Sequence, residues 1–162
     1  MSSVGKTSKL TITIRAMTAE DIPRITALEQ ELFPDPWSEN AFHEALAEDD
    51  WGSLVALDDG EIVGYACYLT IDVESHLTNI AVVEAYRRKS VAKQLLEHIL
   101  RVVKEAECEY LLLEVRPTNT GAIAFYRRHG FHQLYRRPNY YRNPVEDALV
   151  MVYYLDDARA SD

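Results

Sequence analysis

Alternation of apolar and polar side chains predicts a half-buried strand near the start of the chain, in residues 10–15. Thr18 followed by Asp21 resembles a capping box, so a helix is expected to begin there. The segment 33–37 contains two prolines, which cannot continue a helix. Ser38 can then cap a second, shorter helix.

Three strands and one long helix are predicted in the middle of the chain. Residues 53–57 and 61–69 form two apolar segments that flank Asp-Asp-Gly at 58–60, a sequence typical of a hairpin turn. Residues 76–83 predict a further strand. Apolar side chains then recur at helical spacing through residues 91–106, which indicates a long amphipathic helix.

The last third of the chain predicts a strand, a helix and two closing strands. Residues 110–115 are almost continuously apolar, as expected of a strand that is buried on both faces. Asn119 or Thr120 can cap the following helix, and Gly130 is placed to end it. The closing strands are expected at residues 132–137 and 148–154.

This order of elements indicates an α/β domain. A mixed, mostly antiparallel central sheet of about seven strands should be flanked by about four helices. We expect one domain over residues 10–155. Residues 1–9 are small and polar without an apolar signal core, so a flexible tail is expected there, and the acidic residues 156–162 are expected to fray.

The composition narrows the class of partner. The chain of 162 residues has a formal net charge of −9, which disfavours a nucleic-acid binder because neutralising phosphates requires a basic face. The charge is compatible with a basic partner or a cationic substrate. No apolar run is long enough to span a bilayer, so no membrane partner is expected. Cys67 and Cys108 lie far apart, and no cysteine or histidine has metal-ligand spacing, so we expect no metal and a cytoplasmic location.

A basic segment precedes the predicted long helix. Arg87, Arg88 and Lys89 stand directly before it, and Lys93 lies in its first turn. The N-terminus of a helix already carries about half a positive charge, so exposed cations there cost up to about 1 kcal/mol each. The arrangement becomes favourable if an anion such as a pyrophosphate binds to the cations and the free backbone N–H groups. A solvated run of charge without a ligand is the alternative.

The same segment resembles part of a known family. Residues 87–92, Arg-Arg-Lys-Ser-Val-Ala, lie between a predicted strand and a predicted helix. They resemble the acetyl-CoA pyrophosphate loop of the GNAT superfamily of acetyltransferases, Gln/Arg-x-x-Gly-x-Gly/Ala. The resemblance implies that acetyl-CoA binds at Arg88, Lys89, Ser90, Val91, Ala92 and Lys93.

One position departs from the family pattern. Ser90 stands where the family has glycine, which tolerates a positive φ and lets the backbone approach a phosphate closely. A serine in that conformation costs about 1–2 kcal/mol, part of which its hydroxyl could recover by donating to a phosphate oxygen. We expect weaker cofactor binding, and a loop that no longer binds the cofactor is the alternative.

A second resemblance lies in residues 113–119, Leu-Glu-Val-Arg-Pro-Thr-Asn, followed by residues 124–131, Ala-Phe-Tyr-Arg-Arg-His-Gly-Phe. They resemble the RimI branch of the GNAT enzymes, the ribosomal-protein N-terminal alanine acetyltransferases. The similarity extends over nearly the whole chain. It implies the GNAT fold, with Glu114 as the general base and Tyr126 as the general acid.

Acetyl transfer to an amine needs both roles. An N-terminal ammonium, with a pKa of about 7.7–8.0, must lose a proton before its nitrogen can attack, and the leaving thiolate benefits from gaining one. Each residue also has a structural alternative. Glu114 could pair with Arg116, two residues further on, and Tyr126 could be a core aromatic next to Phe125.

The resemblance implies further contacts to acetyl-CoA. Asn119, otherwise a helix cap, would hydrogen-bond the pantetheine arm of CoA. The backbone of Ile80, Ala81 and Val82 would contact the acetyl and pantetheine portions.

The acceptor end is less defined by the sequence. Aromatic and acidic side chains in loops could clamp an N-terminal peptide segment, and the candidates are Trp37, Glu31, Glu74, Tyr140 and Tyr141. Trp37 could instead join the first two helices, and the two tyrosines could pack under a sheet edge. His76 stands where members of the branch often have a smaller polar residue, and it could alter the acceptor pocket.

The sequence therefore predicts an acetyl-CoA-dependent N-acetyltransferase that modifies the N-terminal α-amine of a basic protein, such as a ribosomal protein. No nucleophilic cysteine or serine triad is visible, which favours direct transfer over an acyl-enzyme. The alternatives are a GNAT enzyme that acts on a small amine or a lysine side chain, a non-catalytic acyl-CoA-binding module motivated by Ser90, and a plain interaction domain.

Overall fold

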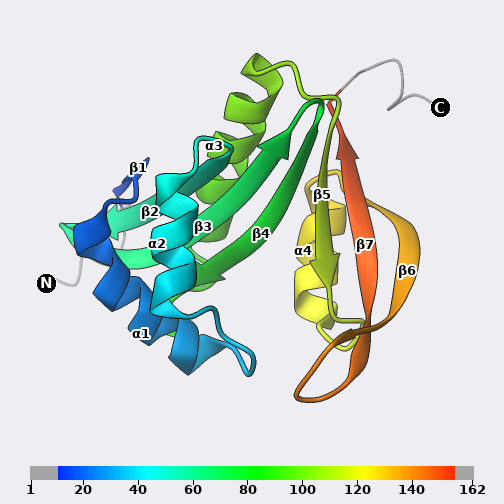
Figure 1. The fold of residues 1–162 in the computed structure, drawn as a ribbon, viewed down its shortest axis with the longest axis horizontal. Helices are drawn as coiled ribbons and strands as arrows, with labels where there is room; N and C mark the ends of the chain where they lie inside the picture. Colours follow the sequence, from blue (N-terminus) through cyan, green and yellow to red (C-terminus); the bar gives the residue numbers. More distant parts are fainter. Residues whose placement is uncertain (1–10, 156–162) are drawn as a thin grey trace, which may run out of the picture.

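The computed structural model describes residues 11–155, so the tails expected at 1–9 and 156–162 lie outside the described residues. The elements follow the predicted order and form a seven-stranded sheet with four α-helices, as Figure 1 shows. They are β1 (Ile12–Ala16), η2 (Ala19–Asp21), α1 (Ile22–Leu32), α2 (Glu39–Ala47), β2 (Trp51–Asp58), β3 (Glu61–Ile71), β4 (Glu74–Val82), η3 (Glu84–Tyr86), α3 (Val91–Glu105), β5 (Tyr110–Val115), α4 (Thr120–Arg128), β6 (His132–Tyr141) and β7 (Glu146–Tyr154).

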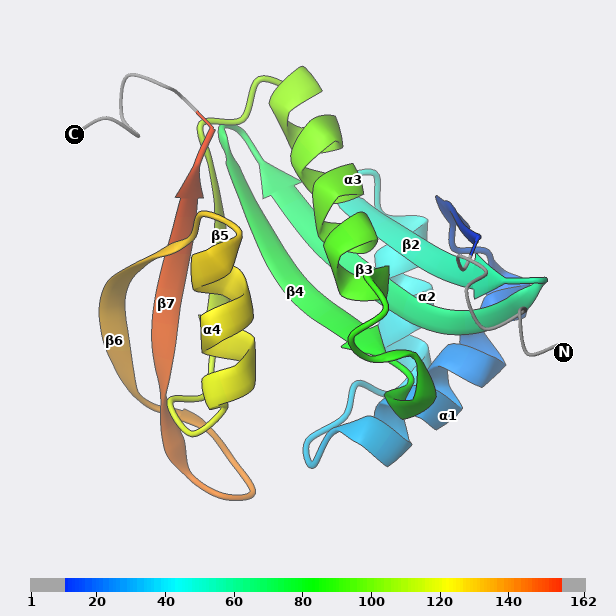
Figure 2. The same cartoon turned by 180° about the vertical axis from the view of Figure 1, so that it is seen from behind.

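The sheet is mixed and mostly antiparallel, as predicted. Its strand order is β1-β2-β3-β4-β5-β7-β6, and the pair β4–β5 is parallel while the other neighbours run antiparallel. Helices α1 and α2 cover one face, and α3 and α4 lie on the other (Figures 1 and 2). Within residues 11–155, no helix is long and apolar enough to cross a membrane.

Local capping signals fix where the helices begin and end. The Thr18 N–H donates to the Asp21 carboxylate at 2.8 Å, although one short 3-10 turn precedes α1. The Ser38 hydroxyl accepts from an N–H in the first turn of α2. The Asn119 side chain does the same for α4, and Gly130, with φ +98°, follows the end of that helix. These caps were all expected because each depends on residues close together in sequence.

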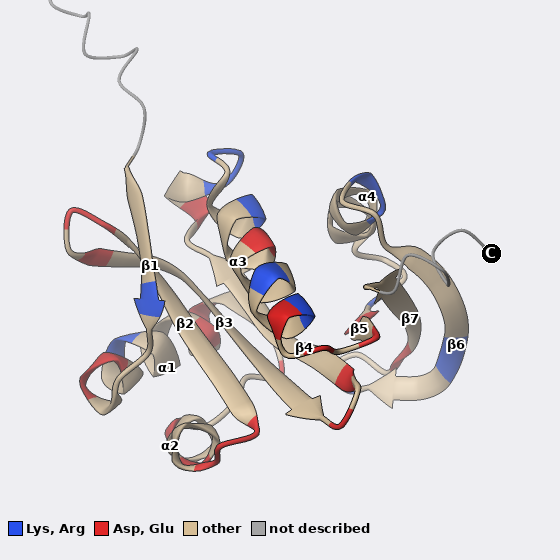
Figure 3. Ribbon diagram, turned by 90° about the horizontal axis from the view of Figure 1, so that it is seen from above, with Lys and Arg blue, Asp and Glu red and all other residues tan. Residues whose placement is uncertain are grey.

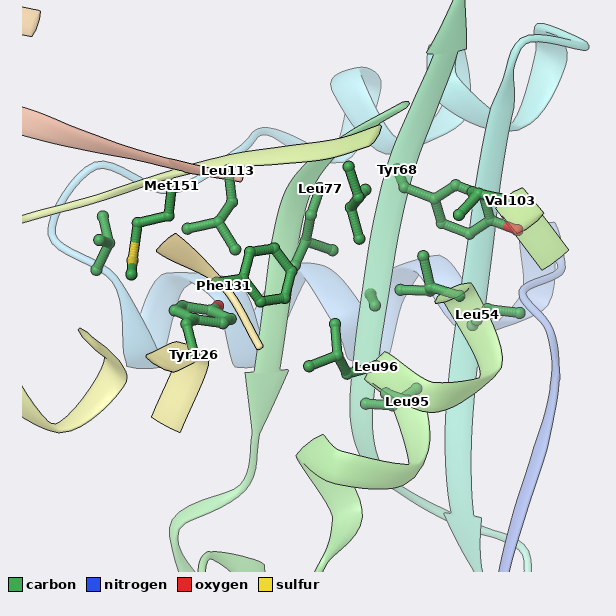
Figure 4. Close-up of a cluster of buried hydrophobic side chains, with 14 of the residues drawn as sticks. Leu54, Tyr68, Leu77, Leu95, Leu96, Val103, Leu113, Tyr126, Phe131 and Met151 are labelled. Carbon is green, nitrogen blue, oxygen red and sulfur yellow. The ribbon is translucent and has the colours of Figure 1, made fainter. Parts of the chain in front are cut away.

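The sheet has a hydrophobic core on each face. On the α3 and α4 side, Leu95 and Leu96 pack toward Leu113, Met151 and other buried side chains, as Figure 4 shows. On the opposite side, α1 and α2 bury Ile22, Ile25 and Phe42 against the sheet. Burying an aliphatic or aromatic side chain contributes about 1.5–3 kcal/mol, so both layers are needed to hold the helices on the sheet.

The prediction that residues 110–115 are buried on both faces is wrong. Leu111, Leu113 and Val115 are buried, whereas Leu112 and Glu114 point to the other face and are partly exposed. Helices α1 and α2 lie over β2 to β4 and leave this face of β5 open (Figure 1). The consequence is functional, because Glu114 faces an accessible side of the sheet.

Strands β4 and β5 separate partway along their length. They pair only from Glu74 to Leu77 and from Tyr110 to Leu113. Beyond that point both strands continue without pairing to each other, and they diverge in Figure 2. A register shift between β3 and β4, at Thr78, falls at the start of this separation. Backbone groups on the inner edge of β4 are therefore left without a neighbouring strand.

Candidate active site

A cavity of about 590 Å³ opens where β4 and β5 diverge. The α1–α2 loop, β4, β5, the start of α4 and the end of β6 contribute to its wall. We call it the acceptor cavity. Of the residues expected at the site, it brings together Trp37, Ile80, Glu114, Asn119, Tyr126, Tyr140 and Tyr141.

Glu114 is held at one carboxylate oxygen. Its side chain is 11% exposed, and Oε1 lies 2.6 Å from Nε2 of His76 and 3.4 Å from the Tyr140 hydroxyl, which donates to it. Within residues 11–155, no hydrogen bond to Oε2 of Glu114 is formed. That oxygen is left for a group that enters the cavity.

The alternative pairing of Glu114 with Arg116 does not occur. Arg116 follows the end of β5, so strand alternation no longer decides where its side chain points. Its guanidinium donates to Glu146 at 3.2 Å and to the backbone carbonyls of Arg142 at 2.7 Å and Pro144 at 2.9 Å. It also stacks over the ring of Tyr141. Arg116 thus anchors the β6–β7 loop beside the acceptor cavity.

Tyr126 combines both roles considered for it. It is 7% exposed and packs edge-on against Phe125 and Phe131, and Figure 4 shows it in the buried cluster. It also lines the acceptor cavity. Burial raises the pKa of Tyr126 above its usual value, so the hydroxyl is protonated at neutral pH.

A second pocket, of about 530 Å³, lies between the loop before α3 and the end of α4. We call it the basic pocket, because the described residues that line it include no Asp or Glu. Figure 3 shows the Lys and Arg colour on both of these segments. The lining cations are Arg87, Arg88, Lys93 and Arg128. None of these four makes an ion pair with another residue of the range 11–155.

The basic pocket contains most of the expected cofactor residues. Arg88, Ser90, Val91, Ala92, Lys93 and Val82 line it. Of the other four, Ile80 and Asn119 line the acceptor cavity instead. Lys89 lies near the ring of Tyr86 and Ala81 of β4 is buried, and both line neither pocket. Arg128 was not expected from sequence, since only the packing of α4 brings it to the loop.

Ser90 has the conformation expected of the missing glycine. It has φ +67° and ψ +11°, in the left-handed region, and directly precedes α3 without its side chain capping that helix. Only glycine adopts this conformation without strain. The backbone geometry of the loop is therefore retained although the residue type is not.

Several acidic residues lie in places that the sequence did not indicate. Glu29 of α1 is 2% exposed and lines the acceptor cavity, as does Asp35. Glu74, proposed as an acceptor contact, lies at the paired start of β4, opposite Ile71, and lines neither pocket. Glu31 is exposed and also lines neither.

The His76–Glu114 contact was missed as well. The two residues are separated by 38 positions, and they meet because His76 is the register partner of Leu112 in the parallel pair. A hydrophobic pattern predicts strands but not the register of a parallel pair. Within the described part of the chain, no group of three or more His, Cys, Asp or Glu side chains is arranged to hold a metal ion.

The comparisons with known proteins show the class of enzyme to which this fold belongs. The acetyltransferase (GNAT) family matches residues 22–131, so the chain belongs to this family, which uses acetyl-CoA.

Its similarity to individual members points to one branch. The [ribosomal protein bS18]-alanine N-acetyltransferase of Escherichia coli K12 is 33% identical over 86% of this chain and 95% of that protein. The N-alpha-acetyltransferase RimI of Mycobacterium tuberculosis is 34% identical over 86% of this chain and 90% of its own length. The crystal structure of the ribosomal-protein-S18-alanine N-acetyltransferase from Escherichia coli has a TM-score of 0.83 at 30% identity, covering 90% of this chain and 95% of that one.

Proposed function

We propose that this protein transfers the acetyl group of acetyl-CoA to the N-terminal α-amine of a protein, with Glu114 as general base and Tyr126 as general acid. The observation that carries the proposal is that both side chains line one cavity at the separation of β4 and β5. The basic pocket continues from it along the same two elements, β4 and α4.

The residues present fit acetyl-CoA as the acyl donor. The basic pocket offers four cations and the free N–H groups at the start of α3, a combination suited to phosphates. The inner edge of β4, beyond Leu77, offers backbone groups that the pantetheine amides can pair with, as an added strand would. The Asn119 side-chain oxygen already accepts from Ala122, which leaves its amide N–H groups for the same arm.

The chemistry requires proton transfers away from the nitrogen and to the sulfur, and one exchange of bonds. The ammonium of the acceptor gives a proton to Oε2 of Glu114, directly or through water, and the amine nitrogen then attacks the thioester carbonyl carbon. A C–N bond forms, the C–S bond breaks, and the nitrogen releases its second proton to solvent as it becomes an amide. The Tyr126 hydroxyl gives its proton to the departing sulfur. The Tyr126 phenolate is then reprotonated through solvent by the proton that Glu114 took from the acceptor. His76 holds Oε1 of Glu114, so the carboxylate presents Oε2 to the amine.

The acceptor we propose is the N-terminus of a basic protein, and a ribosomal protein of the kind that the relatives modify is the leading candidate. The acceptor cavity is lined by three acids, Glu29, Asp35 and Glu114, and by one base, Arg116, which already pairs with Glu146. This balance and the net charge of −9 favour a cationic N-terminal segment.

The test is an acetylation assay followed by mass spectrometry. Three acceptors are offered with acetyl-CoA: a basic peptide with a free N-terminal alanine, the same peptide with a blocked N-terminus and an internal lysine, and a small primary amine. The proposal expects the first to be acetylated at its α-amine in preference to the other two. Acetylation of lysine or of the small amine in preference to the α-amine would contradict it. A binding module would instead be indicated if acetyl-CoA stabilised the protein against heat but no acceptor was acetylated, and if Tyr126→Phe was stabilised by acetyl-CoA to the same extent.

A further inference from the structure

Glu29 is a buried carboxylate in the wall of the acceptor cavity. It lies near the end of α1, and the residue is 2% exposed. Within residues 11–155, no Lys, Arg or His forms an ion pair with it. An unpaired charge in such a position is strongly unfavourable unless hydrogen bonds replace the lost water.

Three donors surround this carboxylate, and they come from three different elements. The hydroxyl of Tyr65 on β3 donates to Oε1 at 2.7 Å. The backbone N–H of Trp37 donates to Oε2 at 3.0 Å. The side-chain amide of Asn79 on β4 lies 3.3 Å from Oε2 and 3.5 Å from Oε1. Hydrogen bonds to an ionised group are stronger than neutral ones, so Glu29 joins these elements more firmly than a neutral side chain would.

The Trp37 contact reaches the segment 33–37 that joins α1 to α2. We call this segment the acceptor loop, because all five of its residues line the acceptor cavity and none lines the basic pocket. Pro34 and Pro36 have no backbone N–H, so the loop has few donors with which to fix itself. The N–H of Trp37, which could otherwise bind within the loop, donates to Glu29. Through Asn79 the same carboxylate reaches β4, next to Ile80 of the cavity wall.

We propose that Glu29 is a positioning residue that holds the acceptor loop against β4 and thereby sets the affinity for the acceptor, while acetyl-CoA binding depends on other residues. The inference rests on the proposed function and adds to it. Tyr65 supports this role: its burial and the nearby Glu29 raise the pKa of Tyr65, so its hydroxyl remains a donor.

The experiment compares steady-state kinetics of three variants with the unmodified protein, using a basic peptide with a free N-terminal alanine as acceptor. Glu29→Gln keeps the shape but places an amide N–H₂ against one of the donors now facing the carboxylate. Glu31→Gln removes an exposed carboxylate from the same helix and is the matched control. Tyr65→Phe removes one donor while it preserves the carboxylate and the buried ring.

We expect Glu29→Gln to raise KM for the peptide about tenfold or more, the effect of losing one hydrogen bond to a charged group. KM for acetyl-CoA should stay unchanged. Tyr65→Phe should also raise KM for the peptide, by a smaller factor, and leave KM for acetyl-CoA unchanged. Glu31→Gln should match the unmodified protein in both constants. If Glu29→Gln does not fold, Tyr65→Phe carries the test alone.

Equal increases in both KM values, or a fall in kcat at unchanged peptide KM, would overturn the inference, and so would unchanged kinetics in Glu29→Gln. Failure of the proposed function itself is distinguishable. In that case the unmodified protein would show no turnover with the peptide at all.

Discussion

The acceptor cavity and the basic pocket lie along the same strand and the same helix but hold their charges in opposite ways. Two of the three acids of the cavity are fixed by hydrogen bonds from other elements: His76 and Tyr140 hold Glu114, and three donors hold Glu29. The cations of the basic pocket come mostly from one short run and form no ion pair within residues 11–155.

The difference follows from the chemistry each region has to perform. A general base must have its oxygen within hydrogen-bond reach of the proton that it abstracts, so its orientation has to be set before the substrate arrives. A phosphate chain needs positive charge and N–H groups but tolerates variation in where each cation lies. Substitutions in the cavity should therefore act through geometry, and substitutions in the basic pocket through charge.

The largest effect is expected from Glu114→Gln. The amide cannot take a proton from the acceptor ammonium, so kcat should fall about 10²–10⁴-fold, the usual contribution of a general base. Stabilisation by acetyl-CoA in a thermal-shift titration should remain, because Glu114 lines the acceptor cavity and not the basic pocket. Near-normal turnover in this variant would exclude Glu114 as the base.

The Arg15–Asp21 ion pair lies outside both regions, so its substitution should change the stability of the fold without changing the kinetics. The Arg15 guanidinium lowers the pKa of Asp21 from 3.8 to about 2. A lowered folded pKa stabilises the fold above the unfolded value, and this contribution should be lost as the pH falls from about 4 to 2. Because Arg15 is 42% exposed and screened by solvent, we expect about 1–2 kcal/mol.

Urea unfolding of Asp21→Asn between pH 2 and pH 7 checks this prediction. The variant should have lost stability at pH 7 but little at pH 2, and its kinetic constants should match those of the unmodified protein at neutral pH. The same loss at both pH values would show that the pair contributes no pH-dependent stability.

His76→Leu should reduce kcat about tenfold, because Glu114 would lose the hydrogen bond that orients it. The effect should not add to that of Glu114→Gln, since the two residues act through one carboxylate. His76→Gln, which keeps an N–H donor, is expected to recover part of the activity. A full tenfold loss from His76→Leu in the Glu114→Gln background would mean that His76 acts independently.

Lys93→Gln tests the basic pocket. Losing one cation near the start of α3 should weaken acetyl-CoA binding about fivefold, corresponding to about 1 kcal/mol, with kcat unchanged. The effect should shrink as salt is raised, because exposed charges are screened. A loss that is independent of salt would indicate that Lys93 acts through shape rather than charge.

The smallest effect is expected from Ser90→Gly, and it should be an improvement. Glycine relieves the strain of φ +67° but adds freedom to the unfolded chain, which leaves a net gain of less than about 1 kcal/mol. We expect the melting temperature to rise by less than about 2–4 °C, with a larger further rise in the presence of acetyl-CoA. Weaker acetyl-CoA binding in Ser90→Gly would show that the serine hydroxyl contributes more than its backbone costs.

Much of the fold and one of the two regions could be predicted from the amino-acid sequence. The basic loop is contiguous in sequence, and its strand-to-helix context is visible in the hydrophobic pattern. Ser90 could be identified as strained because the family that the loop resembles has glycine at this position, and the structure gives it φ +67°. The interpretation of β5 as buried on both faces failed, because the pattern of one strand does not reveal which helices cover it.

The sequence by itself determined the order of strands and helices, their caps and the basic loop, since these depend on interactions within a few residues of one another. Tertiary structure decided the rest of the site. His76 meets Glu114 across 38 positions and Glu29 meets Asn79 across 50, and Arg128 joins the loop only when α4 packs on the sheet. Such contacts depend on strand register and on the packing of whole layers, which a local pattern does not encode.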